Sequence, residues 1–327
     1  MSARSAVLPR RAAWLEVTRR LPAATWPFAV FGALFLLGGV LRPSLLSLDG
    51  LWSTAAFAMI LAIASAGQTI AIVQGGIDLS IANTITVAAL TFLSSTQHGT
   101  LVALLLALAA GAAVGLLNGL AIAELEISPI VMTIATNGLL FGIVLLAFDF
   151  SQLTDTPQIA RDLTSGKIAV LGTEIPAILP LGLALLVGLQ LVLSRTGWGR
   201  ALYLIGSASE MAALAGLPVR RIRLLGYVLS GVLGALAGVV IASYFAQTSV
   251  TMGDTYLLGS VAAVVVGGAS IFGGSGTLIG TLGGALVLGQ IATLVPVLNL
   301  GVNVQQLIYG AIILAVVALY GRRRADV

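Results

Sequence analysis

The carboxylate of Asp78 stands out chemically because it lies between two long apolar runs, in the segment QGGIDLSIAN, residues 74–83. An ionisable side chain at membrane depth costs at least about 2.5 kcal/mol and is tolerated where it faces a bundle interior or a cavity. Gly75 and Gly76 permit a backbone break, so amides near the start of a following helix can hold the carboxylate as an N-cap. The carboxylate can also accept hydrogen bonds from solute hydroxyls. Both roles are open, and the pattern favours the structural one.

Amide and hydroxyl groups recur within the other apolar runs and could line a path for a hydroxyl-rich solute. Taken singly, each is expected to form a hydrogen bond between helices rather than to contact a solute. These groups belong to Gln68, Asn83, Asn118, Asn137, Tyr227, Ser230 and Gln247. The candidates for a translocation pathway or structural break are Gly75, Gly76, Asp78, Ser80, Asn83, Asn118, Asn137, Tyr227 and Ser230.

Catalytic chemistry has little support in the sequence. Cysteine is absent and the single histidine, His98, lies in the polar segment STQHGT, so neither a thiol nucleophile nor a histidine-based metal site is expected. No Ser/His/Asp or paired-carboxylate arrangement is evident. The G-x-x-x-x-G-K-[ST] phosphate loop is also absent, and the glycine-rich segment GGSGTLIG, residues 273–280, reads as packing or a helix break. We predict no enzyme activity, metal or cofactor, and ATP bound only by a separate subunit.

The composition is that of an integral membrane protein. The 327 residues are 58% hydrophobic and 9% charged, with a mean hydropathy of +1.08, whereas a soluble domain carries roughly 25% charged residues. Backbone groups in hydrocarbon must be satisfied internally, and the long apolar runs predict an all-α bundle. The net charge of +4 arises from arginines beside apolar segments, which indicates membrane topology rather than nucleic-acid binding.

Apolar stretches between polar breaks predict about ten transmembrane helices. Their ranges are 25–41, 52–73, 80–96, 100–123, 129–148, 177–194, 223–245, 257–272, 277–295 and 303–320. Basic residues concentrate on the cytoplasmic side of membrane proteins, and ten crossings place both termini there. The predicted organisation is a cytoplasmic arm (1–24), a transmembrane domain (25–320) with a cytoplasmic loop (195–222), and a basic cytoplasmic tail (321–327).

Glycines spaced by four residues predict close contacts between helices, because small residues let two backbones approach. The stripes are Gly111, Gly115 and Gly119, then Gly234 and Gly238, then Gly276 and Gly280.

The cytoplasmic loop contains the signals of a two-turn helix. Ser207 and Glu210 have the spacing of a capping box, Gly216 can close a helix in the left-handed conformation, and Pro218 cannot continue one. A helix this short is marginal alone, so it must pack against something. It either docks into a groove of a partner or lies against the protein's own helices or the lipid surface. Its apolar side chains are Met211, Ala212, Ala213, Leu214 and Leu217.

Four segments carry motifs on which a resemblance to a known family rests. The first is GGIDLS, residues 75–80, and the second contains Asn118, Gly119, Pro129 and Thr133. The third contains Thr196, Gly199, Arg200, Gly206, Ala212, Ala213, Gly216, Leu217, Tyr227, Ser230 and Gly231. The fourth contains Gly267, Gly268, Gly273, Gly274, Gly276, Gly280 and Ala285. From about residue 50 onward, the chain resembles the ribose-, xylose- and arabinose-type sugar permeases of bacterial ABC importers.

This resemblance implies the fold, the partners and the role of the loop. It implies a multi-pass permease of the bacterial inner membrane that translocates a pentose or hexose delivered by a periplasmic or lipid-anchored binding protein. ABC ATPase subunits, a second permease copy or similar permease, and membrane lipid are the expected partners. The implied ATPase-coupling residues are Gly206, Ser207, Glu210, Met211, Ala212, Ala213, Leu214, Gly216 and Leu217.

The sequence also leaves alternatives for the transported solute and for the energy source. Related permeases carry nucleosides, autoinducers or branched-chain amino acids. A self-contained ion-coupled transporter would normally use several buried acids, and Asp78 is the only carboxylate well inside the apolar runs.

Overall fold

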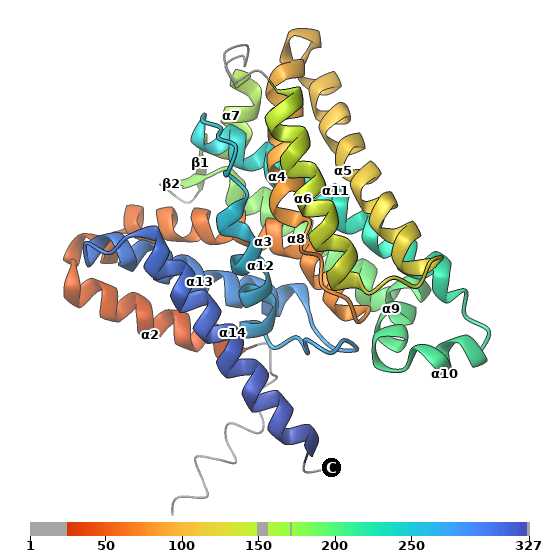
Figure 1. Ribbon diagram of the computed structural model, residues 1–327. Coiled ribbons are helices and arrows are strands. Elements are labelled where there is room, and N and C mark those ends of the chain that lie inside the picture. The colour runs from red at the N-terminus through yellow and green to blue at the C-terminus, as the bar shows by residue number, and fades with distance from the viewer. Residues whose placement is uncertain (1–24, 149–155, 171, 326–327) are drawn as a thin grey trace, which may run out of the picture.

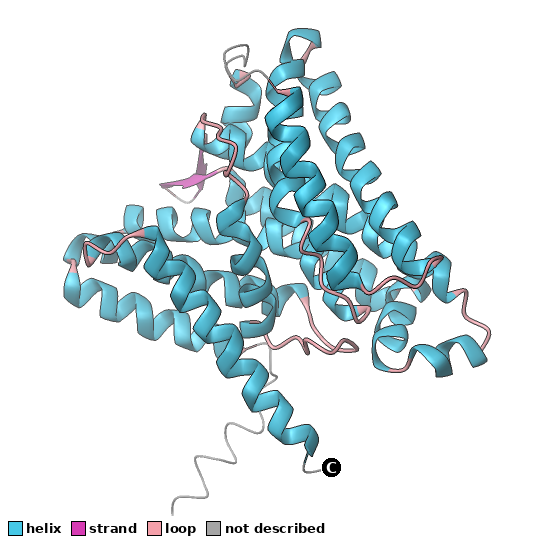
Figure 2. Cartoon of the chain, viewed as in Figure 1, coloured by secondary structure: helices cyan, strands magenta, loops and turns pink. Residues whose placement is uncertain are grey.

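The computed structural model describes residues 25–148, 156–170 and 172–325 and is almost entirely helical (Figures 1 and 2). The predicted arm, residues 1–24, lies outside the described residues. The helices are α2 (Trp26–Leu41), η1 (Pro43–Leu46), α3 (Leu48–Val73), α4 (Ile81–Ser95), η2 (Thr96–His98), α5 (Thr100–Ala123), α6 (Pro129–Ala147), α7 (Gln158–Thr164), α8 (Ile178–Arg195), α9 (Gly197–Ser207), α10 (Ser209–Leu214), α11 (Val219–Phe245), α12 (Asp254–Val266), α13 (Leu278–Val297) and α14 (Val302–Ala325). The strands are β1 (Lys167–Val170) and β2 (Thr173–Pro176).

Each of the ten predicted spans coincides with a helix of the structure. Within the described residues, six helices are long and apolar enough to cross a membrane, and they are α3, α5, α6, α8, α11 and α13. Helices α2, α12 and the apolar part of α14 are shorter. The all-α membrane fold is therefore confirmed, while ten complete crossings stay a prediction.

One predicted span boundary is wrong, and two other segments contain structure that the sequence did not predict. The span 257–272 ends at Val266, and residues 267–277 form a loop, because glycines there adopt left-handed backbone conformations that no helix contains. Helix α14 continues to Ala325, into the predicted tail. The outer polar break contains α7 and an antiparallel β1–β2 hairpin, and its residues 149–155 and 171 lie outside the described part of the chain.

Helix α3 is the centre of the bundle. All of its residues from Ala58 to Val73 are buried, and α11, α13, α12 and α8 pack around it. A helix that is apolar on every face is expected inside a bundle rather than at its surface. Figure 1 shows α4, α5 and α6 on one side of α3 and α2, α13 and α14 on the other.

The glycine stripe of α5 packs against α11, as predicted. A Cβ atom at Gly111 or Gly115 would overlap the backbone of Gly231 or Tyr227. Gly238 of α11 lies equally close to the backbone of α4. The third stripe is only partly correct, because Gly276 lies in the loop before α13.

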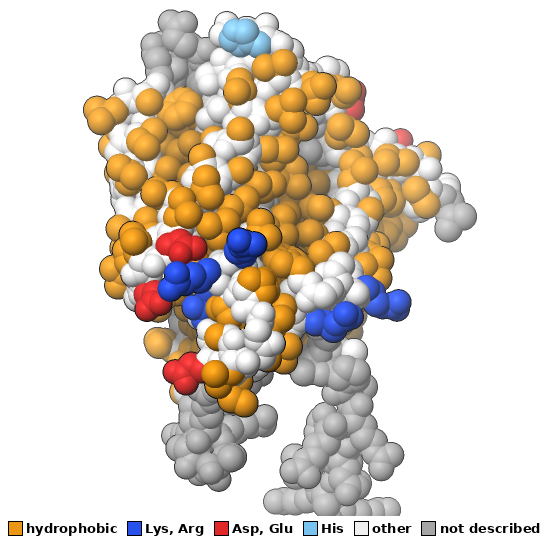
Figure 3. Space-filling view, turned by 90° about the vertical axis from the view of Figure 1, so that its right-hand side faces the viewer, with side chains coloured by type: hydrophobic (Ala, Val, Ile, Leu, Met, Phe, Trp, Pro, Cys, Tyr) orange, Lys and Arg blue, Asp and Glu red, His pale blue; other side chains and the backbone are white. Residues whose placement is uncertain are grey.

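The outer helices expose large apolar side chains. Leu105, Leu139 and Leu183, on α5, α6 and α8, are examples, each about half exposed. Figure 3 shows one such face, largely hydrophobic above and carrying its basic and acidic side chains mainly in its lower half. This separation is typical of a lipid-facing belt with one charged end.

Candidate functional site

The break between α3 and α4 is closed by hydrogen bonds of its own backbone. Gly75 has a left-handed φ of 88°. The N–H groups of Gly75 and Gly76 donate to the carbonyls of Ile72 and Ala71, both at 2.9 Å. This is the Schellman arrangement, which satisfies carbonyls that a helix end leaves free. The chain can therefore leave the helix inside the bundle without exposing unpaired backbone groups.

Asp78 follows this closure and accepts three hydrogen bonds while only 2% exposed. Its Oδ1 accepts from the backbone N–H and the hydroxyl of Ser80, at 3.1 and 2.6 Å. Its Oδ2 accepts from the hydroxyl of Ser230, on α11, at 2.8 Å. The N-cap residue of α4 is Ser80, so Asp78 is not itself the cap. The carboxylate instead ties the break to α11.

The Asp78 network continues through α5 to α6. The hydroxyl of Ser80 accepts from Nδ2 of Asn118 at 2.9 Å, and Oδ1 of Asn118 accepts from the hydroxyl of Thr136 at 2.6 Å. Asn118 and Thr136 are both fully or almost fully buried. Thr136 was missed from sequence, because a single threonine inside an apolar run carries no distinguishing signal.

The other predicted pathway residues divide into separate groups. Asn83 donates from Nδ2 to the backbone and side-chain oxygens of Asn137, at 3.0 and 3.1 Å, and so joins α4 to α6. Gln247 lies beyond the end of α11 and lines a different surface hollow. The buried hydroxyl of Tyr227 has no hydrogen-bond partner among the described residues.

The loop at residues 195–222 contains two helices. α9, which was not predicted, begins at an N-cap in which the hydroxyl of Thr196 accepts from the N–H of Gly199 at 3.0 Å. The predicted capping box is wrong, because Ser207 belongs to the last turn of α9 and its hydroxyl donates to the carbonyl of Leu204. The N-cap residue of α10 is Ala208, one residue after the predicted Ser207, and no side chain forms a capping hydrogen bond there.

The predicted closure of α10 at Gly216 is confirmed. Gly216 has a φ of 78°, and the N–H groups of Gly216 and Leu217 donate to the carbonyls of Ala213 and Ala212 at 3.0 and 3.1 Å. These are the two bonds of the Schellman arrangement.

One face of α10 packs inward and the other is open. Ala212 is only 5% exposed, whereas Met211 is 67% and Leu214 is 83% exposed. Helix α10 lies with α9 at the lower right of Figure 1, toward the end of the molecule at which α14 ends. The helix therefore rests on its own chain through Ala212, which is one of the two expected arrangements, and leaves two large apolar side chains uncovered.

Backbone contacts connect the end of α9 to two breaks of the bundle. The first lies between α3 and α4, and the second is the α12–α13 loop, residues 267–277. A Cβ atom at Gly206 would overlap the carbonyl of Val73 and lie 2.6 Å from the backbone nitrogen of Gly274. The N–H of Gly274 donates to the same Val73 carbonyl at 3.0 Å. We call Val73–Gly75, Gly206 and Gly273–Gly274 the glycine joint. The end of α9 therefore packs directly against both breaks.

The hydroxyl of Tyr203 strengthens the contact between α9 and the second break. It donates to the carbonyl of Gly276 at 2.8 Å. Burial raises the pKa of Tyr203 above its ordinary value, so the hydroxyl stays protonated at neutral pH and remains a donor.

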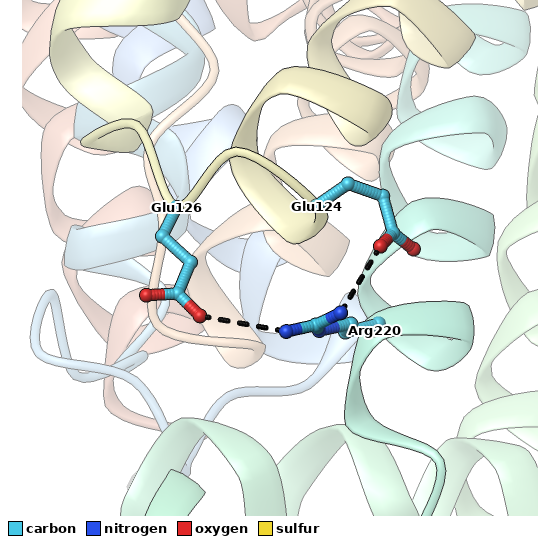
Figure 4. A network of polar contacts seen from close by, with 3 residues as sticks. All are labelled: Glu124, Glu126 and Arg220. Carbon is cyan, nitrogen blue, oxygen red and sulfur yellow. Dashed lines mark hydrogen bonds and ion pairs between the residues drawn. The ribbon is translucent and has the colours of Figure 1, made fainter.

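A cavity of about 420 Å³ opens beside this joint. The first break, the α5–α6 loop, α10 and the start of α11 enclose it. At its edge the guanidinium of Arg220 lies 3.4 Å from Glu124 and 3.8 Å from Glu126 (Figure 4). All three side chains are largely exposed, so these ion pairs contribute little stability, about 0–1 kcal/mol each.

Residues 50–317 match the family described as branched-chain amino acid transport system / permease component. The chain belongs to this family of ABC-importer permeases and is a multi-pass inner-membrane transport component rather than an enzyme. No solved structure gives a significant match.

Several curated relatives cover most of the chain. The autoinducer 2 import system permease protein LsrD of Photorhabdus laumondii is 32% identical over 91% of both chains. LsrC of Enterobacter sp. strain 638 is 33% identical over 94% of this chain and 88% of its own. The ribose import permease protein RbsC of Bacillus subtilis is 31% identical over 91% of this chain and 93% of its own.

Asp78→Asn should lower the stability of the purified protein by about 1–3 kcal/mol, because a buried accepting oxygen is replaced by a donor in a satisfied network. Thermal unfolding in detergent measures this change. The exposed Asp254→Asn, in the first turn of α12, is the matched control and should cost less than about 1 kcal/mol. Unchanged stability of Asp78→Asn, with a raised half-saturating solute concentration, would assign Asp78 to the solute path instead.

Gly206→Ala should destabilise the chain by about 1–3 kcal/mol, since the added methyl meets backbone rather than a movable side chain. The control is Gly188→Ala on α8, where nothing lies within 4 Å of the new methyl and the effect should be neutral or stabilising by up to about 1 kcal/mol. Equal unfolding temperatures for the two variants would argue against a tight joint.

Proposed function

We propose that the chain is the translocating subunit of a bacterial ABC importer for a small hydroxyl-rich solute, in the first place a pentose or hexose. ATPase subunits on separate chains supply the energy, and a periplasmic or lipid-anchored protein delivers the solute. In this proposal α10 is the coupling helix, the segment on which an ATPase subunit docks.

The observation that carries this proposal is the open face of α10. Met211 and Leu214 expose large apolar side chains on a helix of only six residues. Such a helix gains little stability by itself, so an exposed apolar pair on it is costly unless a partner covers it. The sequence contains no nucleotide-binding loop of its own. A nucleotide-binding partner docked on α10 accounts for both features.

The charge distribution supports a cytoplasmic location of α10. Arg195, Arg200, Arg220 and Arg221 cluster around α9 and α10, with Glu210 as the acidic residue of that stretch. Basic residues favour the cytoplasmic side. In this orientation both chain termini are cytoplasmic, and the β1–β2 hairpin is on the periplasmic side.

The glycine joint gives the proposed partner a route to the bundle. A docked ATPase that moves α10 also moves α9, and Gly206 lies directly against both helix breaks. Breaks of this kind are places where a bundle can change between two arrangements. Closure of the ATPase subunits would bias that two-state change and expose the solute path to alternate sides.

Names of the relatives support the solute class. RbsC is a ribose permease by name, and LsrD and LsrC are autoinducer 2 permeases by name. Autoinducer 2 is therefore the second candidate solute. Asp78 already accepts three hydrogen bonds from Ser80 and Ser230, which argues against an ion-coupled cycle through that carboxylate. The permease pairs with a second copy or with a similar permease, and the solute path would run between them.

Reconstitution tests the energy source. The purified chain in proteoliposomes should transport neither ribose nor autoinducer 2 down an imposed proton or sodium gradient. Addition of the ATPase and binding protein from the same transport system should produce ATP-dependent uptake. Accumulation by the chain alone would contradict the proposal, and ligand screening of the binding protein would identify the solute.

Leu214→Asp should reduce both copurification of the ATPase and ATP-driven uptake at least tenfold, because it places a charge in the apolar contact. The matched control is Leu125→Asp in the α5–α6 loop, a leucine that is 71% exposed and lies off α10. Both variants should unfold at the wild-type temperature. A Leu214→Asp protein that still binds and works with its ATPase would remove α10 from the coupling role. Ala212 is unsuited to this test, because it is buried against its own chain.

A further inference from the structure

The cavity beside the glycine joint has polar groups that the coupling role does not use. Its volume of about 420 Å³ lies within the range of small-molecule sites, roughly 300–1,000 Å³. It is larger than a lone inorganic anion requires.

Two buried side chains at this cavity lack hydrogen-bond partners. Gln74 is 2% and Tyr227 is 1% exposed, and both line the cavity. Among the described residues, neither amide atom of Gln74 nor the hydroxyl of Tyr227 is hydrogen-bonded. A buried polar group without a partner costs about 1–3 kcal/mol, so a ligand that bonds these groups recovers that cost. Hydroxyl groups suit both residues, because they donate and accept.

The cavity also offers one uncompensated cation. Arg223 lines it and donates from Nη2 to the hydroxyl of Ser209, on α10, at 3.1 Å. The ion pairs formed within the described residues involve Lys167 and Arg220, not Arg223. Arg220 is occupied by two glutamates at the edge (Figure 4). The guanidinium of Arg223 is therefore the group available to an anion, and guanidinium matches phosphate in a bidentate geometry.

We propose that this cavity binds a small phosphorylated polyol, with the phosphate on Arg223 and the hydroxyls on Gln74 and Tyr227. Two sources share this chemistry: a soluble sugar or glycerol phosphate, and the glycerophosphate headgroup of an anionic lipid. The site contacts the first break through Gln74 and α10 through Ser209, so an occupied site would connect the two segments. Binding depends only on the described contacts, whereas the cytoplasmic origin of the ligand rests on the proposed orientation.

Calorimetric titration of the full-length chain in phosphatidylcholine nanodiscs tests the site. Ribose 5-phosphate and glycerol 3-phosphate are the probes and ribose is the neutral comparison. Saturable binding of a phosphorylated probe, at least tenfold tighter than that of ribose, is expected. Arg223→Gln should weaken binding at least tenfold, and Tyr227→Phe should weaken it a few-fold.

Arg221→Gln is the matched control, because Arg221 is an exposed neighbour that does not line the cavity. It should leave binding unchanged. Helix content by circular dichroism establishes that each variant is folded. No saturable binding, equal binding by Arg223→Gln and the wild type, or equal losses in Arg221→Gln and Arg223→Gln would each overturn the proposal.

Nanodiscs containing phosphatidylglycerol separate the two sources. If the site binds a lipid headgroup, phosphatidylglycerol competes with the soluble probe. Binding of the probe to the wild type is then weaker in these nanodiscs than in phosphatidylcholine nanodiscs, whereas the residual binding to Arg223→Gln is unchanged. Undiminished binding in these nanodiscs assigns a soluble ligand. Neither measurement involves ATPase or transport, so failure of this site leaves the proposed permease function intact, and the reverse also holds.

Discussion

The structure depends on one constraint: a backbone that leaves a helix inside a membrane bundle must satisfy its own hydrogen bonds. The described breaks meet it in the same way. α3 and α12 both end in Schellman closures, with Gly75 and Gly268 in the left-handed conformation. These closures turn the chain within one or two residues, which leaves short segments deep in the bundle. The loop before α13 then starts a new helix with its own cap at Thr277.

The side-chain network around Asp78 follows from the first of these turns. The turn delivers a carboxylate beside α11, where the hydrogen bonds that it accepts from the described residues come from Ser80 and Ser230. Hydroxyl and amide groups on α11, α5 and α6 complete its hydrogen bonds directly or through Ser80 and Asn118. Such a network is strongly stabilising only if every member is satisfied. Of the predicted path residues, Asn118 and Ser230 belong to the Asp78 network and Asn83 bonds Asn137. The hydroxyl of Tyr227 and the amide of Gln68 have no hydrogen-bond partner among the described residues.

The sequence predicted the features that depend on local chemistry. Apolar run length placed ten helices, and the helix-closing role of Gly216 needed only its own backbone. Contacts between segments that lie far apart in the sequence could not be predicted. Ser230 lies 152 positions from Asp78, and no spacing rule connects them. The capping box failed because Ser207 forms the last turn of α9 and its hydroxyl donates to the carbonyl of Leu204. Residues 257–272 were predicted to form one span, because average hydropathy does not reveal that a glycine has a positive φ.

The glycine joint explains why the α9–α10 segment and both breaks contain glycine where they meet. Backbones that touch without side chains between them have little compressible space, so a displacement of one is passed to the other rather than absorbed. Gly206 occupies the point at which α9 meets both breaks. Tyr203 adds a directional hydrogen bond to the second break. A larger residue at this point would separate the surfaces, and a flexible side chain would absorb the motion. Close backbone contact at the joint therefore connects α9, and the exposed α10 that follows it, to the interior of the bundle.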